Sequence, residues 1–133
     1  FERSPMLPLT TRPYSVETEW YSGSVDVPVF QIEELCATKV RALYQRSKGR
    51  DLFDLWLALT ELCIDPRAII GTFSTYRPEG LTRVLMEQNL EAKLADHDFC
   101  HDCDALIVGG AEMYGYDAHT AGRLVMDRVV SLL

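Results

Sequence analysis

Apolar residues recur at helical spacing through most of this chain, and in one segment they surround nearly the whole expected helix. That segment begins near Arg50 or Asp51 and continues to about Cys63, and its apolar residues are Leu52, Phe53, Leu55, Trp56, Leu57, Leu59 and Leu62. A helix that is apolar on all sides is buried in the centre of a protein. The sequence therefore predicts a helical bundle with this segment at its centre.

The segment before it predicts an amphipathic helix from about Gln31 to Gln45. On a helical wheel its apolar residues fall within roughly 80° of Ile32; they are Leu35, Cys36, Val40 and Leu43. Lys39 falls inside the same stripe. A lysine that faces a core must either reach outward to water or meet an anion.

The rest of the chain predicts more helices and, at its start, a short hairpin. Helices are expected over residues 67–76, 81–95 and 117–132, with Pro66 before the first and Asp117 as N-cap of the last. Strands are expected over residues 14–21 and 25–30, joined by a turn at Ser22-Gly23-Ser24, and Pro28 favours an edge position. The predicted fold class is α+β and mostly α, with a lead-in and hairpin over residues 1–30 and a helical domain over 31–133.

The basic residues are concentrated in one place on an acidic chain. The 133 residues make one domain, and their net charge of -7 excludes polyanion binding by the protein as a whole. Four cations nevertheless fall within ten positions that contain no acid: Arg41, Arg46, Lys48 and Arg50. This patch is either a solvated helix end that complements the helix dipole, or a phosphate site that includes Lys39 and Arg50.

Two acids follow the basic patch. Asp51 fits the first turn of a helix, where the dipole favours an acid. Asp54 lies among apolar residues on a helix that should be nearly enclosed, so its carboxylate needs a cation. The residues leave two interpretations open: an ion pair with Lys39 or Arg50 that ties two helices together, or a cleft lined by carboxylates and a lysine that admits a nucleotide and magnesium.

The four cysteines favour a reducing compartment. Cys36 and Cys63 lie in apolar helical patterns and are expected to be reduced core residues of a cytoplasmic protein. Cys100 and Cys103, with His97 and His101 nearby, form a candidate metal site, but no second ligand pair accompanies them, so a helical turn with incidental thiols is the alternative. No apolar run approaches the length that a membrane span needs.

Residues 33–56 resemble the signature of the AbiEii family of nucleotidyltransferase toxins. In that family a helix with the pattern E-L-x-A-x-K leads through a basic loop to R-D-x-x-D-L. The first pattern occurs here from Glu34 to Lys39 and the second from Arg50 to Leu55, in the family's order and spacing.

The resemblance implies the toxin of an abortive-infection toxin–antitoxin pair, with a cognate antitoxin as partner and the C-terminal part of a polymerase-β-like fold. Such enzymes use Mg2+ and a nucleoside triphosphate, and some relatives add nucleotides to the acceptor end of tRNA. Carried over by position, Lys39 and Arg50 would bind the nucleotide, and Asp54 and Asp51 would be the catalytic acids. Arg41, Arg46 and Lys48 are then candidate RNA contacts.

One part of the family pattern has no counterpart in this sequence. The family's metal-binding core has a Gly-Ser turn followed about a dozen residues later by Asp-x-Asp, but Gly23-Ser24 is followed only by Asp26. Asp96 and Asp98, like Asp102 and Asp104, have no such turn before them and are read as solvated acids. We therefore expect the metal-binding half to precede Phe1 and these 133 residues alone to be inactive.

Two other functions remain open at this point. The chain could be a non-catalytic helical module that binds RNA or a protein through residues 41–50. The charged residues could also form a purely structural network that fixes the helix pair; its members would be Lys39, Arg50, Asp51 and Asp54.

Overall fold

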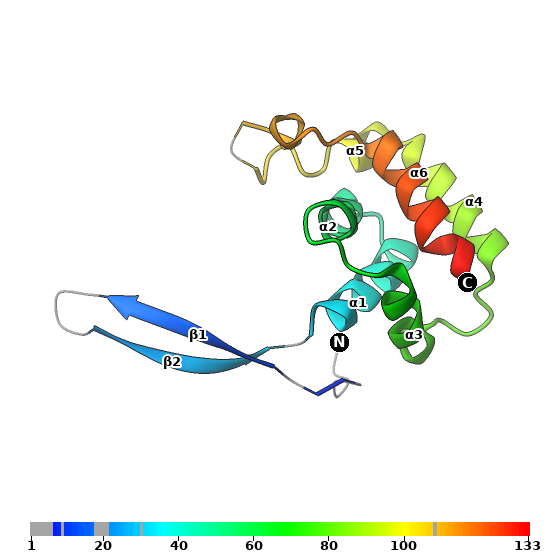
Figure 1. Cartoon of the computed structure of the whole chain (residues 1–133). Coiled ribbons are helices and arrows are strands. Elements are labelled where there is room, and N and C mark those ends of the chain that lie inside the picture. Colours follow the sequence, from blue (N-terminus) through cyan, green and yellow to red (C-terminus); the bar gives the residue numbers. More distant parts are fainter. Residues whose placement is uncertain (1–6, 9, 18–21, 30, 108) are drawn as a thin grey trace.

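The computed structural model describes residues 7–8, 10–17, 22–29, 31–107 and 109–133. Over these residues the chain is mostly helical, as predicted (Figure 1). Its helices are α1 (Ile32–Gln45), α2 (Gly49–Thr60), α3 (Pro66–Tyr76), α4 (Arg83–Leu94), α5 (His97–Cys100) and α6 (Ala118–Arg128). Two short 3-10 helices, η1 (Ala111–Tyr114) and η2 (Val130–Leu132), and two strands, β1 (Thr10–Glu17) and β2 (Ser22–Val29), complete the described elements.

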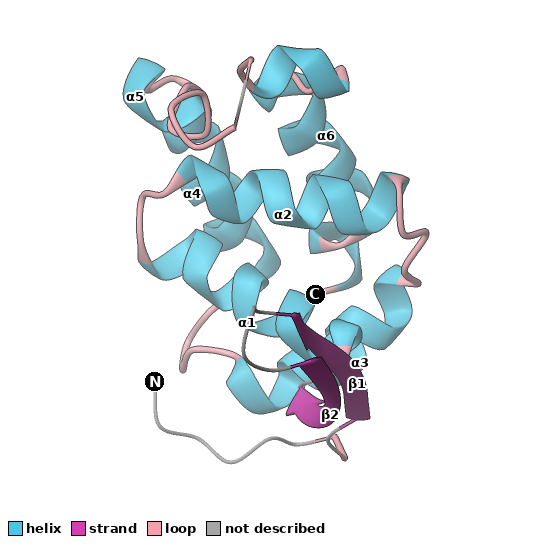
Figure 2. Ribbon diagram, turned by 90° about the vertical axis from the view of Figure 1, so that its left-hand side faces the viewer, coloured by secondary structure: helices cyan, strands magenta, loops and turns pink. Residues whose placement is uncertain are grey.

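Helix α2 runs across the middle of the bundle, as its apolar pattern predicted (Figure 2). It packs against α1 on one side and α6 on the other, while α1 also packs against α3. Its buried apolar side chains are Leu52, Leu55, Trp56, Ala58 and Leu59. The helix ends at Thr60, however, so the prediction that it extends to Cys63 was wrong. Leu62 is exposed, and Cys63 is an exposed residue with a positive φ of 51° rather than a core cysteine.

Helix α1 has the expected bounds, but its buried face differs slightly from the predicted stripe. Cys36, Val40 and Leu43 are buried as predicted, whereas Leu35 is 39% exposed and Ala37 is buried in its place. The core therefore covers a face rotated away from Leu35. The Lys39 side chain, which is 33% exposed, lies at the margin of this face and not in the core.

Local capping explains where the later helices begin. The Asp65 carboxylate accepts a hydrogen bond from the Arg67 N–H, and Pro66 occupies the first turn of α3. Asp117 caps α6 through the Thr120 N–H, which confirms its predicted role. The last predicted helix is divided into α6 and η2. Among the described residues, no helix is both long and apolar enough to cross a membrane.

The two strands form an antiparallel ribbon whose bounds differ from the predicted ones. Thr10 pairs with Val29 and Glu17 with Ser22, so the connection consists of residues 18–21, which lie outside the described residues. Ser22, Gly23 and Ser24 belong to β2 and not to a turn. Turn-forming residue types can occupy a strand when the partner strand supplies the pairing. Figure 1 shows the ribbon extending away from the helices.

Candidate functional site

A charged cluster joins the end of α1 to the start of α2. Only three residues separate the two helices, so the last turns of α1 lie next to the first turns of α2. The Lys39 Nζ lies 2.9 Å from Asp54 Oδ2 and 3.5 Å from Asp51 Oδ1. Arg46, directly after α1, completes the cluster. The structure thus brings together three of the four residues that the sequence grouped, with Arg46 in the place of Arg50.

Asp51 is the buried acid of this cluster, with a side chain that is 0% exposed. Arg46 grips it with two hydrogen bonds, from Nε to Oδ2 and from Nη2 to Oδ1, each 2.8 Å long. A planar guanidinium matches a carboxylate in this two-pronged geometry. The hydrogen bond to Asp51 raises the pKa of Arg46 above its ordinary value. A buried carboxylate is thereby fully paired, as its burial requires.

Asp54 is more accessible than the sequence predicted. Its side chain is 44% exposed, so the prediction that it is the enclosed acid was wrong. Asp51 and Asp54 are three residues apart and share one face of α2, but Arg46 covers only the first of them. Asp54 and Lys39 therefore form the part of the cluster that solvent or a ligand can reach.

Lys93 of α4 holds the turn that carries Arg46, and sequence reasoning missed it. Its Nζ donates to the carbonyl oxygens of Leu43, Tyr44 (3.1 Å) and Arg46 (2.8 Å) at the end of α1. These are carbonyls that have no partner within their own helix, and a lysine near a helix C-terminus satisfies them. Burial lowers the pKa of Lys93. In the sequence, Lys93 looks like any other lysine of a helix, so no sequence feature indicated this role.

Glu34 is a second buried acid that the residue-by-residue reasoning passed over. Its side chain is almost fully enclosed, and it accepts hydrogen bonds from the Tyr76 hydroxyl and from the Leu7 N–H at 3.0 Å. It thereby ties α1 to the end of α3 and to the segment before β1. The sequence carried one signal for the importance of Glu34, because Glu34 is the first residue of the E-L-x-A-x-K pattern.

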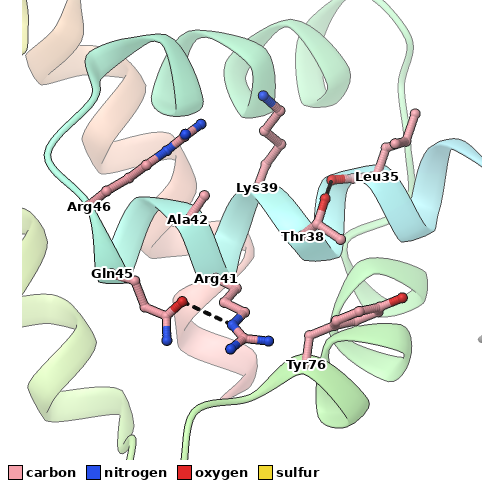
Figure 3. A pocket seen from close by; sticks show the side chains of 8 residues that line it. All are labelled: Leu35, Thr38, Lys39, Arg41, Ala42, Gln45, Arg46 and Tyr76. Atoms are coloured by element: carbon pink, nitrogen blue, oxygen red, sulfur yellow. Dashed lines mark hydrogen bonds between the residues drawn. The ribbon is translucent and has the colours of Figure 1, made fainter. Parts of the chain in front are cut away.

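A groove of about 500 Å3 follows the accessible face of α1 next to the charged cluster. It is lined by Leu35, Thr38, Lys39, Arg41, Ala42, Gln45 and Arg46 of α1 and its end, and by Tyr76 of α3. Three of these residues are cations and none is an acid. Figure 3 shows Lys39 and Arg46 extending to one side of α1, and Arg41 and Gln45 to the other. The groove is thus a positively charged, partly apolar surface on an acidic protein.

Comparison with protein families identifies this chain. A family model described as the nucleotidyl transferase AbiEii toxin of a type IV toxin–antitoxin system matches residues 1–117. The chain belongs to the AbiEii family. The resemblance seen at residues 33–56 is confirmed and extends over most of the sequence. Comparison with curated proteins and with solved structures gives no match. Membership of this family implies a nucleotidyltransferase toxin and a cognate antitoxin.

The remaining basic residues of the AbiEii signature lie outside the cluster. Arg50 is exposed, its backbone N–H donates to Asp102 Oδ2 at 3.3 Å, and it is not among the residues that line the groove. Lys48 is exposed at the start of α2. Arg41 donates from Nε to Gln45 Oε1 at 2.9 Å and lines the groove. Of the signature's candidate RNA contacts, Arg41 and Arg46 therefore line the same groove. Lys48 is close to them in the sequence but is not among the residues that line the groove.

The residues described in this AbiEii chain do not fit a magnesium site. Both oxygens of Asp51 are bonded to Arg46 and Asp54 Oδ2 is paired with Lys39, and a carboxylate oxygen that is already taken by a cation is a poor metal ligand. In the part of the chain that the structure describes, no three His, Cys, Asp or Glu side chains are grouped to hold a metal. Asp96 instead caps α5, and Asp104 pairs with His101 at 2.9 Å. Cys100 and Cys103 are free thiols.

Proposed function

We propose that this AbiEii chain supplies the triphosphate-contacting part of an enzyme that transfers a nucleotide from a nucleoside triphosphate to an acceptor, with tRNA as the acceptor. One observation carries the proposal. Lys39 is the only cation of the described α1–α2 cluster that bonds to both acids, and it is still one-third exposed beside the groove. An ammonium in this position is held in place and remains able to meet a phosphate.

The other residues of the cluster have distinct parts in this proposal. Asp54 is the catalytic acid of the motif that a substrate can reach, because its side chain is partly exposed next to Lys39. Asp51 is enclosed and paired with Arg46, so it acts by positioning Arg46 and Lys39. Arg50, Arg41 and Lys48 supply positive charge for the nucleotide or for the RNA backbone, where each phosphate contact strengthens binding.

The family's chemistry implies a divalent cation, which we expect to be Mg2+. Because the described carboxylates do not fit that ion, we assign it no ligand in this chain. We propose a cytoplasmic location, because the proposed substrates and the four free thiols are both expected of a cytoplasmic protein.

A second candidate function is a non-catalytic module that binds RNA or a protein partner. The groove favours this function, because three cations without an acid would bind a polyanion whether or not the protein catalyses a reaction. Transfer of a labelled nucleotide separates the two functions, since a binding module would retain RNA and transfer nothing.

The test uses the full-length product of the gene with labelled nucleoside triphosphates and tRNA. Because an ammonium that stabilises transferring phosphate is worth about 100-fold or more in rate, Lys39→Ala should reduce transfer by at least that factor. Asp54→Ala should also reduce it, whereas Arg83→Ala, on the exposed face of α4, should leave it unchanged. Thermal melts establish that each variant is folded. Unchanged transfer in both Lys39→Ala and Asp54→Ala would overturn the assignment.

The same assay tests these 133 residues alone. They contain no Gly-Ser turn followed at the family's distance by Asp-x-Asp, so we expect no transfer from them. Robust transfer would contradict this expectation.

A further inference from the structure

Large apolar side chains are exposed on the segment between α5 and α6. Leu106, Met113 and Tyr114 are each more than half exposed, and they fall within nine positions of the chain. We call these three residues the apolar patch. Figure 1 shows the described part of this segment, residues 101–107 and 109–117, at one end of the bundle and extending beyond the helices. Exposed apolar side chains that occur singly are ordinary, whereas a group of them is typical of a surface that binds another molecule.

Packing within the protein holds the apolar patch in position. The ring of Tyr114 lies edge-on to Phe53 of α2, with 6.4 Å between the ring centroids. The Met113 sulfur occupies the space that a side chain at Gly109 would need, so the chain from 109 to 113 folds back on itself. Side chains that are already ordered lose little conformational entropy when a partner covers them.

Acidic residues accompany the apolar patch. From Leu94 to Gly122 the chain contains no lysine or arginine and six acids, which are Asp96, Asp98, Asp102, Asp104, Glu112 and Asp117. In the part of the chain that the structure describes, no lysine or arginine side chain pairs with any of them. The segment that presents the apolar patch is therefore a source of negative potential.

Three of these acids gather beside the aromatic side chains that support the patch. Asp104, Glu112 and Asp117 line one cavity of about 80 Å3 together with Tyr116. The ring of Tyr116 lies 5.0 Å from that of Phe53, the same ring that Tyr114 contacts. Apolar and acidic groups thus adjoin on one surface.

We propose that the apolar patch is the docking site for a basic segment of a partner protein. The lysine or arginine side chains of that segment lie on the acids, and its apolar side chains cover Leu106, Met113 and Tyr114. Aromatic and methionine side chains are typical of the centres of protein interfaces. The inference does not depend on the proposed transfer reaction, because the patch contains no residue of the α1–α2 cluster.

Charge complementarity selects this occupant. Nucleic acids and anionic lipid surfaces can also cover apolar or aromatic side chains, but both carry negative charge that the six acids would repel. A segment with positive charge is attracted to the same acids, which speeds its association and excludes acidic competitors. The positive groove on α1 and the apolar patch therefore suit partners of opposite charge.

The first experiment measures binding of three fluorescent peptides of equal length to the full-length protein. The peptides alternate lysine with leucine, lysine with serine, and glutamate with leucine. The lysine–leucine peptide should bind about tenfold or more tightly than either of the others, because it alone supplies both positive charge and apolar side chains. Its affinity should fall as salt is added, since salt screens surface charges. Absence of binding, or equal binding of either other peptide, would overturn the inference.

The second experiment removes the apolar contacts. The double variant Met113→Ser, Tyr114→Ser should weaken binding of the lysine–leucine peptide about tenfold or more. The matched control is Val84→Ser, Leu85→Ser, which changes two adjacent exposed apolar residues of α4 and should leave binding unchanged. Circular dichroism establishes that both variants are folded. Equal effects of the two double variants would mean that the peptide does not bind at the apolar patch.

The third experiment removes the charges and does not disturb the aromatic packing. Asp104→Asn, Glu112→Gln should weaken binding of the same peptide and make its affinity less dependent on salt. Glu61→Gln, Glu79→Gln makes the same change of charge at exposed positions elsewhere and should have a much smaller effect. If the two pairs of substitutions have the same effect, the acids beside the patch do not select the partner.

Other occupants would be recognised in the same proteins. A full-length protein that sediments as a dimer, and becomes a monomer in Met113→Ser, Tyr114→Ser, would assign the patch to a second copy of this chain. Binding to phosphatidylglycerol vesicles or to an oligouridylate that is lost in that variant would assign it to an anionic partner. Either result would overturn the inference.

Discussion

Gly49 begins α2 at a point where α5 comes very close. A Cβ built on Gly49 would lie 2.0 Å from the Phe99 carbonyl oxygen and 3.1 Å from the Asp102 Cβ. The neighbouring Arg50 N–H donates to the Asp102 carboxylate across the same contact. Because the nearest atom belongs to backbone, it cannot move aside as the end of a long side chain would. The absence of a side chain at Gly49 therefore allows the first turn of α2, which carries Asp51, to lie this close to α5.

We predict that Gly49→Ala destabilises the protein by about 1–3 kcal/mol, the usual result of forcing extra volume into a packed contact. Gly71→Ala is the matched control. Gly71 is exposed inside α3 and its added methyl group would meet nothing within 4 Å, so alanine should stabilise that helix by about 0.5–1 kcal/mol. Urea unfolding of the two variants measures both changes. A Gly49→Ala protein as stable as the unchanged chain would show that α5 does not constrain α2.

The charged residues show how far sequence reasoning reaches at this scale. A lysine in an apolar stripe and two acids on an apolar helix are local anomalies, and they predicted that Lys39, Asp51 and Asp54 would meet. The sequence assigned the enclosed position to Asp54 and the structure assigns it to Asp51. Helical periodicity puts both acids on one face, but which of them is covered depends on the path of residues 46–48. That path depends on α4, more than forty residues away.

At the scale of elements, Lys93 connects two helices that the chain separates widely. The last turn of α1 leaves carbonyls without a partner in the helix, and one ammonium from α4 bonds to two of them and to the carbonyl of Arg46, the residue after α1. Asn89, one turn earlier on α4, donates to the Tyr44 carbonyl at 3.3 Å. The turn that presents Arg46 to Asp51 is thus fixed from α4 as well as from α2.

We predict that Lys93→Met destabilises the protein by about 1–3 kcal/mol, because it leaves partly buried carbonyls without a donor while it keeps the side-chain length. Amide exchange should speed up most at residues 46–48. Glu91→Ala, on the exposed side of the same helix, should change stability by less than about 0.5 kcal/mol. If amide exchange at residues 46–48 is the same in Lys93→Met as in the unchanged chain, Lys93 does not hold the turn.

Element bounds were predictable where local chemistry sets them. Asp117 and Pro66 determine where helices start through interactions within three residues, and both predicted helix starts were correct. The end of α2 was not predictable in this way, because apolar residues continue past Thr60 while the backbone turns at Cys63. The groove was not predictable either. Its far wall is Tyr76 of another helix, and on α1 it combines residues that the sequence had placed apart, such as Leu35 of the apolar stripe and Arg41 of the basic patch.

At the scale of the whole molecule, two cysteines report on the core. Cys36 of α1 and Cys103, which follows α5, are both buried, and neither is in a disulfide. Burial raises the pKa of each thiol from 9.0 to about 11, with a smaller contribution from nearby acids. A thiolate is thus disfavoured in the folded protein, while the unfolded chain ionises at its ordinary pKa.

We predict that this difference makes the protein less stable as pH rises from about 9 to about 11. In that range the folded state keeps protons that the unfolded state has lost, so the free energy of unfolding falls with pH. Each thiol should contribute about 2 kcal/mol of this loss by pH 11. The double variant Cys36→Ala, Cys103→Ala isolates the contribution, because every other titrating group, including Lys93, is common to both proteins. Urea unfolding at several pH values should show a shallower decline for the variant, and parallel declines would mean that the two thiols ionise as readily in the folded protein as in the unfolded chain.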